Sequence, residues 1–244
     1  MQEIAEWADK DTIMFIEVDN SLVMPKSRMF SHDNNPRLGF IDNMVALGKR
    51  DSKYNKVVAN WYQQRQLKLV EVGWGNFIEK FQTKGAKVYG FCSMPIRLIN
   101  IEKKRVNELV ELGVSFTNKI NAQEELQIEK MDGWSSSFYK GVIFTGPYNV
   151  PHTLIEFIKI TNISPKKLVI INHTENVVKK IDKSLRVFDM DFYSVLYLGV
   201  KDVAGKPDRN VAKLQQQELI YNGKWLEDDA AGALLKARAE ETKK

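Results

Sequence analysis

The sequence predicts an α/β protein whose mostly parallel sheet is flanked by helices in a Rossmann-like core, with a small helical insertion. Short apolar runs alternate with amphipathic stretches of helical period along most of the chain. Runs such as TIMFIEV (Thr12–Val18) are apolar on both faces, as in a buried parallel strand. Alternation of this kind is typical of a parallel sheet that carries helices on both faces.

Each expected strand is a short apolar run. The strands are, in order, Thr12–Val18, Lys87–Ser93, Gly141–Gly146, Lys167–Asn172 and Phe192–Val200. Helices are expected where apolar residues recur every three or four positions, and glycine ends two of them. They are Gly75–Gly85, Ile96–Gly113, Thr153–Ile160, Glu175–Leu185 and Asn210–Leu219. The charges of KKRVNELV, within the second helix, are interpreted as a solvated face.

The stretch between residues 24 and 68 interrupts this alternation. It contains a polar segment, SHDNNPRLG, that reads as a loop, followed by helical patterns at Phe40–Leu47 and Tyr54–Arg65. We interpret residues 24–68 as a helical cap over the carboxyl edge of the sheet, the edge at which open α/β sheets bind ligands. The core would then comprise residues 1–23 and 69–244.

Bulk properties exclude some functions. The chain has 244 residues, a net charge of +5 and one cysteine, so no intramolecular disulfide is expected. Lysines are dispersed without a dense basic block, so no nucleic-acid partner is expected. No run of 18 apolar residues occurs, and therefore no membrane span is expected. The N-terminal MQEIAEWADKD lacks the apolar segment of a signal peptide, although an earlier removal of one would leave the same sequence. A soluble protein is expected, with its compartment open.

Polar residues follow the expected strands and would meet at one edge of the sheet. Glu17 and Asp19, two positions apart, could hold a metal ion and pass a proton, or be two solvated loop acids. The residues after the other strands are Cys92 and Ser93, then Thr145, Gly146 and Tyr148, then Asn172, His173 and Thr174.

In order and spacing, these segments resemble the haloacid dehalogenase-like (HAD) superfamily of Mg-dependent phosphatases. Within it, the chain is similar to a branch found in intracellular bacteria and catalogued as a domain of unknown function. Five motifs carry the resemblance, over about residues 10 to 230: FIEVDNSL, GFCSMP, GVIFTGPYNVPHTLIEFI, SPKKLVIINHTENV and LQQQELIYNGKWLEDD. The resemblance implies phosphoryl transfer through an aspartyl-phosphate, with Mg²⁺ as the cofactor. It also implies a bacterial cytoplasmic protein, or one exported to the periplasm or secreted as an effector.

The first motif departs from the family at its nucleophile. The nucleophilic Asp falls on Glu17, whereas the second Asp, the acid and base for the leaving group, falls on Asp19 and is intact. Glutamate moves the carboxylate outward, and a misplacement of about 1 Å can cost about 10²-fold in rate.

The remaining phosphate and metal positions also depart from the family. The phosphate-binding Thr falls on Cys92, a weak donor for which the adjacent Ser93 could partly substitute. The phosphate-neutralising Lys falls on Val150, and the Asp pair of the fourth motif falls on Asn172 and His173. Mg²⁺ prefers anionic oxygen ligands, so this metal site is expected to be weak or absent. Four of five catalytic positions therefore change together.

Two functions remain open. The first is a pseudophosphatase with no cofactor, acting by binding a protein partner or a small anion. The second is a Mg-dependent phosphomonoesterase with unusual ligands, favoured if Lys26 or Lys53 reaches the cleft. For Cys92 the simpler interpretation is a buried apolar residue. For His173 it is a hydrogen-bonded loop histidine, because a lone histidine is weak evidence for a metal site. A zinc site would need partners, and the chain has only His32, His152 and His173 as histidines and no CxxC motif.

Overall fold

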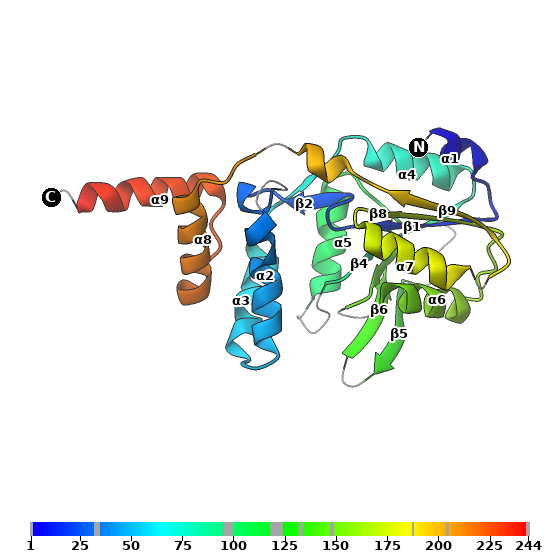
Figure 1. Ribbon diagram of the computed structural model, residues 1–244, viewed down its shortest axis with the longest axis horizontal. Helices are drawn as coiled ribbons and strands as arrows, with labels where there is room; N and C mark the ends of the chain where they lie inside the picture. The colour runs from blue at the N-terminus through cyan, green and yellow to red at the C-terminus, as the bar shows by residue number, and fades with distance from the viewer. Residues whose placement is uncertain are drawn as a thin grey trace. The chain divides into compact units, whose positions relative to one another are not determined.

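The computed structural model describes residues 2–31, 35–94, 100–117, 124–131, 134–146, 149–186, 188–203 and 205–242. The chain divides into two compact units (Figure 1). The α/β unit comprises Met1–Val23 and Leu69–Val200, and the helical unit comprises Met24–Lys68 and Lys201–Lys244. Each unit is described separately below.

The described part of the α/β unit contains a seven-stranded sheet of order β5-β6-β7-β4-β1-β8-β9. From β7 to β9 all neighbouring strands are parallel, and β5 and β6 form an antiparallel hairpin beside them. The bounds are β1 Thr12–Glu17, β4 Lys87–Cys92, β5 Glu125–Met131, β6 Trp134–Tyr139, β7 Val142–Phe144, β8 Lys167–Asn172 and β9 Asp191–Leu196. The prediction of an α/β fold with a mostly parallel sheet flanked by helices is therefore confirmed, with a hairpin that was not expected.

Helices flank this sheet on both sides, as Figure 1 shows for α4 on one side and α6 and α7 on the other. The helices of the unit are α1 Gln2–Trp7, α4 Trp74–Thr83, α5 Ile101–Glu111, α6 Val150–Ile160 and α7 Glu175–Leu185. Ile13 and Phe15 project from β1 into a buried apolar cluster with α6 and α7. The helix side of this cluster comprises Leu154, Phe157, Ile158, Ile181 and Leu185. Burial of these side chains fixes β1 at the centre of the core.

The helix after β4 differs from its prediction. The described residues place α5 at Ile101–Glu111, and residues 96–99 of the expected helix lie outside the described part. The expectation that the charges of KKRVNELV form a solvated face is wrong at Arg105 and Glu108, which are both buried. The reason lies in the helical register, because Arg105 falls four residues after Ile101 and four before Leu109, on the face that packs inward.

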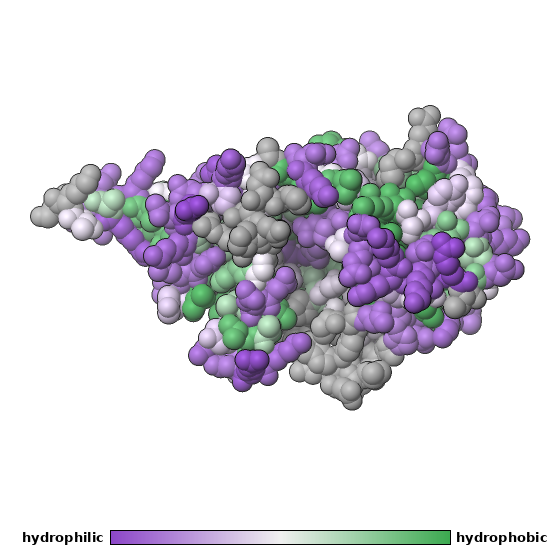
Figure 2. Space-filling model, viewed as in Figure 1, coloured by the Kyte–Doolittle hydropathy of each residue, from purple (hydrophilic) through white to green (hydrophobic). Residues whose placement is uncertain are grey.

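The edge strand β9 ends earlier than expected. It runs from Asp191 to Leu196, whereas the sequence favoured a strand to Val200. A short 3₁₀ helix at Gly199–Asp202 follows it. Leu196 and Leu198 are exposed there, and Figure 2 shows hydrophobic surface along this side of the α/β unit.

The helical unit contains α2 Asn35–Gly48, α3 Lys53–Gln64, α8 Arg209–Asn222 and α9 Asp228–Glu241, with a 3₁₀ turn at Arg28–Phe30. Short strands β2 Val23–Pro25 and β3 Leu67–Leu69 pair where the insertion leaves and rejoins the α/β unit. The expected loop is wrong from Asn35 onward, where α2 begins, because a proline at the second position suits a first helical turn. Buried Phe30, Trp61 and Trp225 pack together, with ring centroids 5.2 Å and 5.8 Å from that of Phe30.

The C-terminal segment belongs with this helical unit. Its main anchor is Asp228, whose carboxylate accepts hydrogen bonds from Ser27 (2.7 Å), Gln215 (3.0 Å) and the backbone and side chain of Arg28 (both 3.0 Å). The sequence-based division had assigned residues 201–244 to the core, and the contacts of the structure group them with 24–68 instead. Contacts about 200 residues apart in the chain, such as that of Ser27 with Asp228, explain the difference.

Candidate functional site

The candidate site lies at the carboxyl ends of β1 and β8. Strand order reverses at β1, which has β4 on one side and β8 on the other. In open α/β sheets such a switch point is where ligands bind. Because β1 ends at Glu17 and β8 at Asn172, the structure brings Glu17, Asn172 and His173 together, as their positions after strands had predicted.

Glu17 and His173 form a hydrogen-bonded pair. Glu17 Oε2 accepts a hydrogen bond from the backbone N–H of His173 at 3.2 Å and lies 2.5 Å from His173 Nδ1. On the other side of the ring, His173 Nε2 lies 3.1 Å from Thr174 Oγ1. The Glu17 side chain is only 15% exposed. The carboxylate is therefore held by protein groups, and the imidazole is fixed by a partner on each nitrogen.

Asp19 is held by a tight turn and by a cation from α5. The turn places Asn20 at a φ of 63°, with its N–H donating to Val23 O at 2.8 Å. Arg105 Nη2 donates to Asp19 Oδ1 at 2.8 Å, and Arg105 Nε lies 2.8 Å from Met94 Sδ. The Arg105 side chain is 1% exposed and that of Asp19 is 38% exposed.

Arg105 is the site residue that sequence reasoning missed. Arg105 is one of several charged residues on an amphipathic helix, so being an arginine does not set it apart from the others. Its spacing does, because a cation between Ile101 and Leu109 on the apolar face needs an acidic partner within reach.

The second-strand position is apolar in character. Cys92 is buried, and burial, with a smaller effect of Asp19, raises the pKa of its thiol well above the usual range. Cys92 O accepts a hydrogen bond from the Thr145 backbone N–H at 2.9 Å, which joins β4 to the end of β7. Ser93 is exposed, and Thr145 Oγ1 lies 3.5 Å from Ser93 Oγ. The hydroxyl group of Ser93 is thus on an exposed residue, whereas that of Thr145 is buried.

The remaining predicted positions offer few ligands for a phosphate or a metal. Val150 begins α6 and packs against the apolar cluster of the core. Asn172 is fully buried, its Oδ1 accepts the Thr174 N–H at 2.7 Å, and its Nδ2 has no partner among the described residues. Tyr148 and His32 lie outside the described residues.

The lysines considered for the cleft have partners inside the helical unit. Lys26 Nζ donates to Gln66 Oε1 at 3.3 Å, and Lys53 Nζ lies 2.9 Å from Asp51 Oδ2. Within the described ranges, no group of three or more His, Cys, Asp or Glu side chains is placed to hold a metal ion. None of the described helices is long and apolar enough to cross a membrane.

Comparisons with known proteins show where the chain belongs. It is 36% identical over 238 residues to the uncharacterized protein RP296 of Rickettsia prowazekii (strain Madrid E), a match that covers 96% of this chain and 87% of the relative. No solved structure matches the chain. A family model matches residues 1–232. The chain therefore belongs to the family described as Protein of unknown function (DUF2608).

Proposed function

We propose that this chain is a HAD-like pseudophosphatase that acts by binding a protein partner and does not transfer phosphoryl groups. The observation that carries the proposal is the engagement of Glu17, at the nucleophile position, by both the backbone and the ring of His173. A nucleophile must present a free oxygen in line with the phosphorus atom. Here Oε2 is occupied, and its hydrogen bonds hold the side chain, and with it Oε1, toward β8.

The charges of the site also support binding without phosphoryl transfer. Two carboxylates, Glu17 and Asp19, lie at this site, and the fixed cation of Arg105 already donates to Asp19. Neither carboxylate favours a phosphate dianion. Val150 supplies no charge, and the protonated thiol of Cys92 is a weak donor. These features favour a protein partner over a small anion.

Magnesium does not fit the side chains at this site. Mg²⁺ requires near-octahedral oxygen ligands, preferably anionic. Asn172 Oδ1 is used by the Thr174 N–H, and His173 offers nitrogen atoms that already have partners. The position of residues 24–68 in the chain, directly after the first strand, supports the companion proposal that they form the cap of a HAD-like core.

A second candidate is a Mg-dependent phosphomonoesterase that works through an acyl-phosphate. The observation that favours it is Arg105, a buried cation that donates to Asp19 at 2.8 Å. Arginine binds phosphate well through its planar, charged group. Here Arg105 could replace the lysine that the family has at the position of Val150. Asp19 would remain the acid and base in this version.

Phosphate release from an aryl phosphate separates the two candidates. Wild type is assayed with and without Mg²⁺ beside Glu17→Ala, and Glu79→Ala, an exposed acid on α4, is the matched control. We expect no Mg²⁺-dependent release from any of the three proteins. The pseudophosphatase proposal would be refuted by metal-dependent turnover that is lost in Glu17→Ala and kept in Glu79→Ala.

A restored variant gives the complementary test. It combines Glu17→Asp, Val150→Lys, Asn172→Asp and His173→Asp, which supply the anionic oxygens and the cation that the family uses. We expect Mg²⁺ binding, measured by calorimetry, in this variant alone. Tight Mg²⁺ binding by wild type would contradict the proposal.

A further inference from the structure

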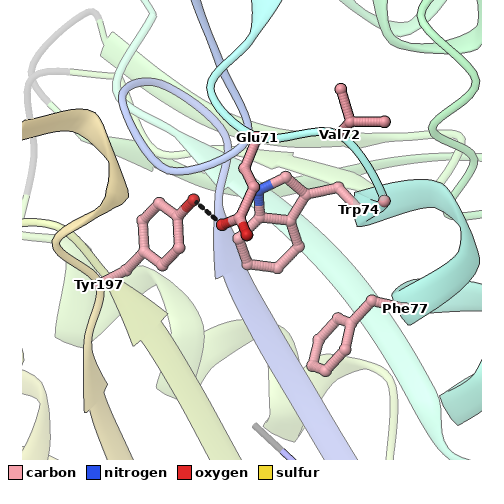
Figure 3. A pocket seen from close by; sticks show the side chains of 6 residues that line it. Glu71, Val72, Trp74, Phe77 and Tyr197 are labelled. Atoms are coloured by element: carbon pink, nitrogen blue, oxygen red, sulfur yellow. Dashed lines mark hydrogen bonds between the residues drawn. The ribbon is translucent and has the colours of Figure 1, made fainter. Parts of the chain in front are cut away.

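A small pocket lies at the same edge of the α/β unit as Glu17, but on other residues. It has a volume of about 200 Å³ and is lined by Glu71, Val72, Gly73, Trp74, Phe77 and Tyr197. The lining comes from the segment that leads into α4, from α4 itself and from the residue after β9 (Figure 3). Pockets for drug-sized ligands hold about 300–1,000 Å³, so this one suits a single compact chemical group.

Three aromatic rings wall the pocket at steep angles. The Trp74 ring meets that of Tyr197 at 64° with centroids 5.1 Å apart, and that of Phe77 at 87° with centroids 5.4 Å apart. Rings that meet edge to face present both faces and edges to the space beside them. The negative faces of aromatic rings attract cations, most strongly for Trp.

A carboxylate completes the lining. Tyr197 Oη donates a hydrogen bond to Glu71 Oε2 at 2.8 Å, and Figure 3 shows the hydroxyl pointing at the carboxylate. The hydrogen bond fixes the charge of the exposed Glu71 beside the rings. Trp74 is 4% exposed, and its Nε1 has no hydrogen-bond partner among the described residues. An unsatisfied buried donor in a pocket wall indicates that an acceptor atom can be placed there.

We propose that this pocket binds an organic cation, an alkylated ammonium group. The rings would contact the methyl groups and Glu71 would neutralise the charge. With choline, which also has a hydroxyl oxygen, Trp74 Nε1 would donate to that oxygen. Choline and the trimethyllysine side chain of a protein both offer the ammonium group. The proposal does not depend on the proposed function, because it uses neither Glu17 nor Asp19.

The pocket is joined to the candidate site through the backbone. The Tyr197 N–H donates to Asn172 O at 2.9 Å, so the residue that holds Glu71 is tied to the last residue of β8. Glu17 is not among the residues that line the pocket, so a ligand there would be linked to the end of β8 without touching Glu17.

Choline titration followed by NMR tests the proposal on the whole chain. The indole N–H resonance of Trp74 is assigned among those of the five tryptophans with Trp74→Phe. We expect this resonance to shift saturably with choline, and Glu71→Gln to weaken binding roughly fivefold. Glu79→Gln removes an exposed acid of α4 that does not line the pocket and should leave binding unchanged.

The neutral isostere 3,3-dimethylbutanol and a trimethyllysine peptide complete the experiment. Binding of the peptide at least roughly tenfold tighter than choline would identify a protein as the source of the cation, and the reverse order would identify a free small molecule. Three results would each overturn the proposal: no saturable shift with either cation, equal binding of the neutral isostere, or Glu71→Gln binding as well as Glu79→Gln does.

Discussion

Replacing Arg105 with Met tests whether the ion pair with Asp19 organises the candidate site. A hydrogen bond to a charged group contributes about 1.5–3 kcal/mol to stability, and removing one partner of a buried ion pair costs about 3–5 kcal/mol. The Arg105 side chain is 1% exposed, but that of Asp19 is 38% exposed, so water recovers part of the loss. Met keeps much of the buried volume. We therefore expect Arg105→Met to lower the free energy of unfolding by about 2–3 kcal/mol.

Urea unfolding followed by circular dichroism measures this change, and hydrogen exchange of the β1 and β4 amides locates it in the α/β unit. Arg186→Met is the matched control, because Arg186 pairs with Asp182 at 2.9 Å but is 70% exposed. It should cost no more than about 0.5 kcal/mol. A double-mutant cycle with Asp19→Asn isolates the pair, with an expected coupling of about 1.5–3 kcal/mol. A coupling under about 0.5 kcal/mol would refute the reasoning.

Three further predictions concern single residues. Cys92, the one cysteine, should react with iodoacetamide at pH 8 at least roughly tenfold more slowly in the folded chain than in the urea-unfolded chain. The reason is that burial raises the pKa of the thiol and excludes the reagent. Mass spectrometry of the alkylated chain measures the two rates. Asp228→Asn should cost about 1–2 kcal/mol and its neighbour Asp229→Asn little, by urea unfolding. Burial raises the pKa of Asp228, but its hydrogen bonds outweigh this and lower it. The two variants should therefore differ most in free energy of unfolding above the pKa of an aspartate in the unfolded chain, about 3.9. The difference should disappear as the pH falls through the pKa of Asp228 in the folded chain. Gly90→Ala should lower the thermal midpoint, because a Cβ there would lie 2.7 Å from a ring carbon of Phe116, and an unchanged midpoint would contradict the close packing.

The parallel strands were predictable because burial on both faces leaves a simple pattern. Thr12–Glu17 and Lys167–Asn172 each contain four consecutive apolar residues, a pattern typical of a strand that is buried on both faces. The hairpin of β5 and β6 was not predictable in the same way. Its sequences, ELQIEKM and WSSSFY, mix charged and small polar residues that suit loops as well as edge strands.

The candidate site was predictable only in part. The sequence predicted that Glu17, Asn172 and His173 lie close together, because they stand at the ends of parallel strands, which meet at one edge of the sheet. Arg105 arrives from a helix, and nothing local in the sequence shows that its side chain reaches Asp19, 86 positions away. The same limit explains the C-terminal segment, since Asp228 reaches Ser27 across 201 positions. Contacts at such separations depend on the folded path of the chain.

The length of the Glu17 side chain matches the distance to His173 in this geometry. Neighbouring strands lie about 4.8 Å apart, and Glu17 ends β1 while His173 follows β8. The glutamate side chain spans that gap, so that Oε2 reaches both the backbone N–H and Nδ1 of His173. An aspartate would be shorter by one C–C bond, about 1.5 Å, and would lose the contact with the ring. A change at position 17 alone would leave a partly buried imidazole nitrogen without its partner, and a change at position 173 alone would leave the carboxylate without its donors. The two residues thus act as one hydrogen-bonded unit at the carboxyl ends of β1 and β8, and a substitution at either position is expected to disturb the other.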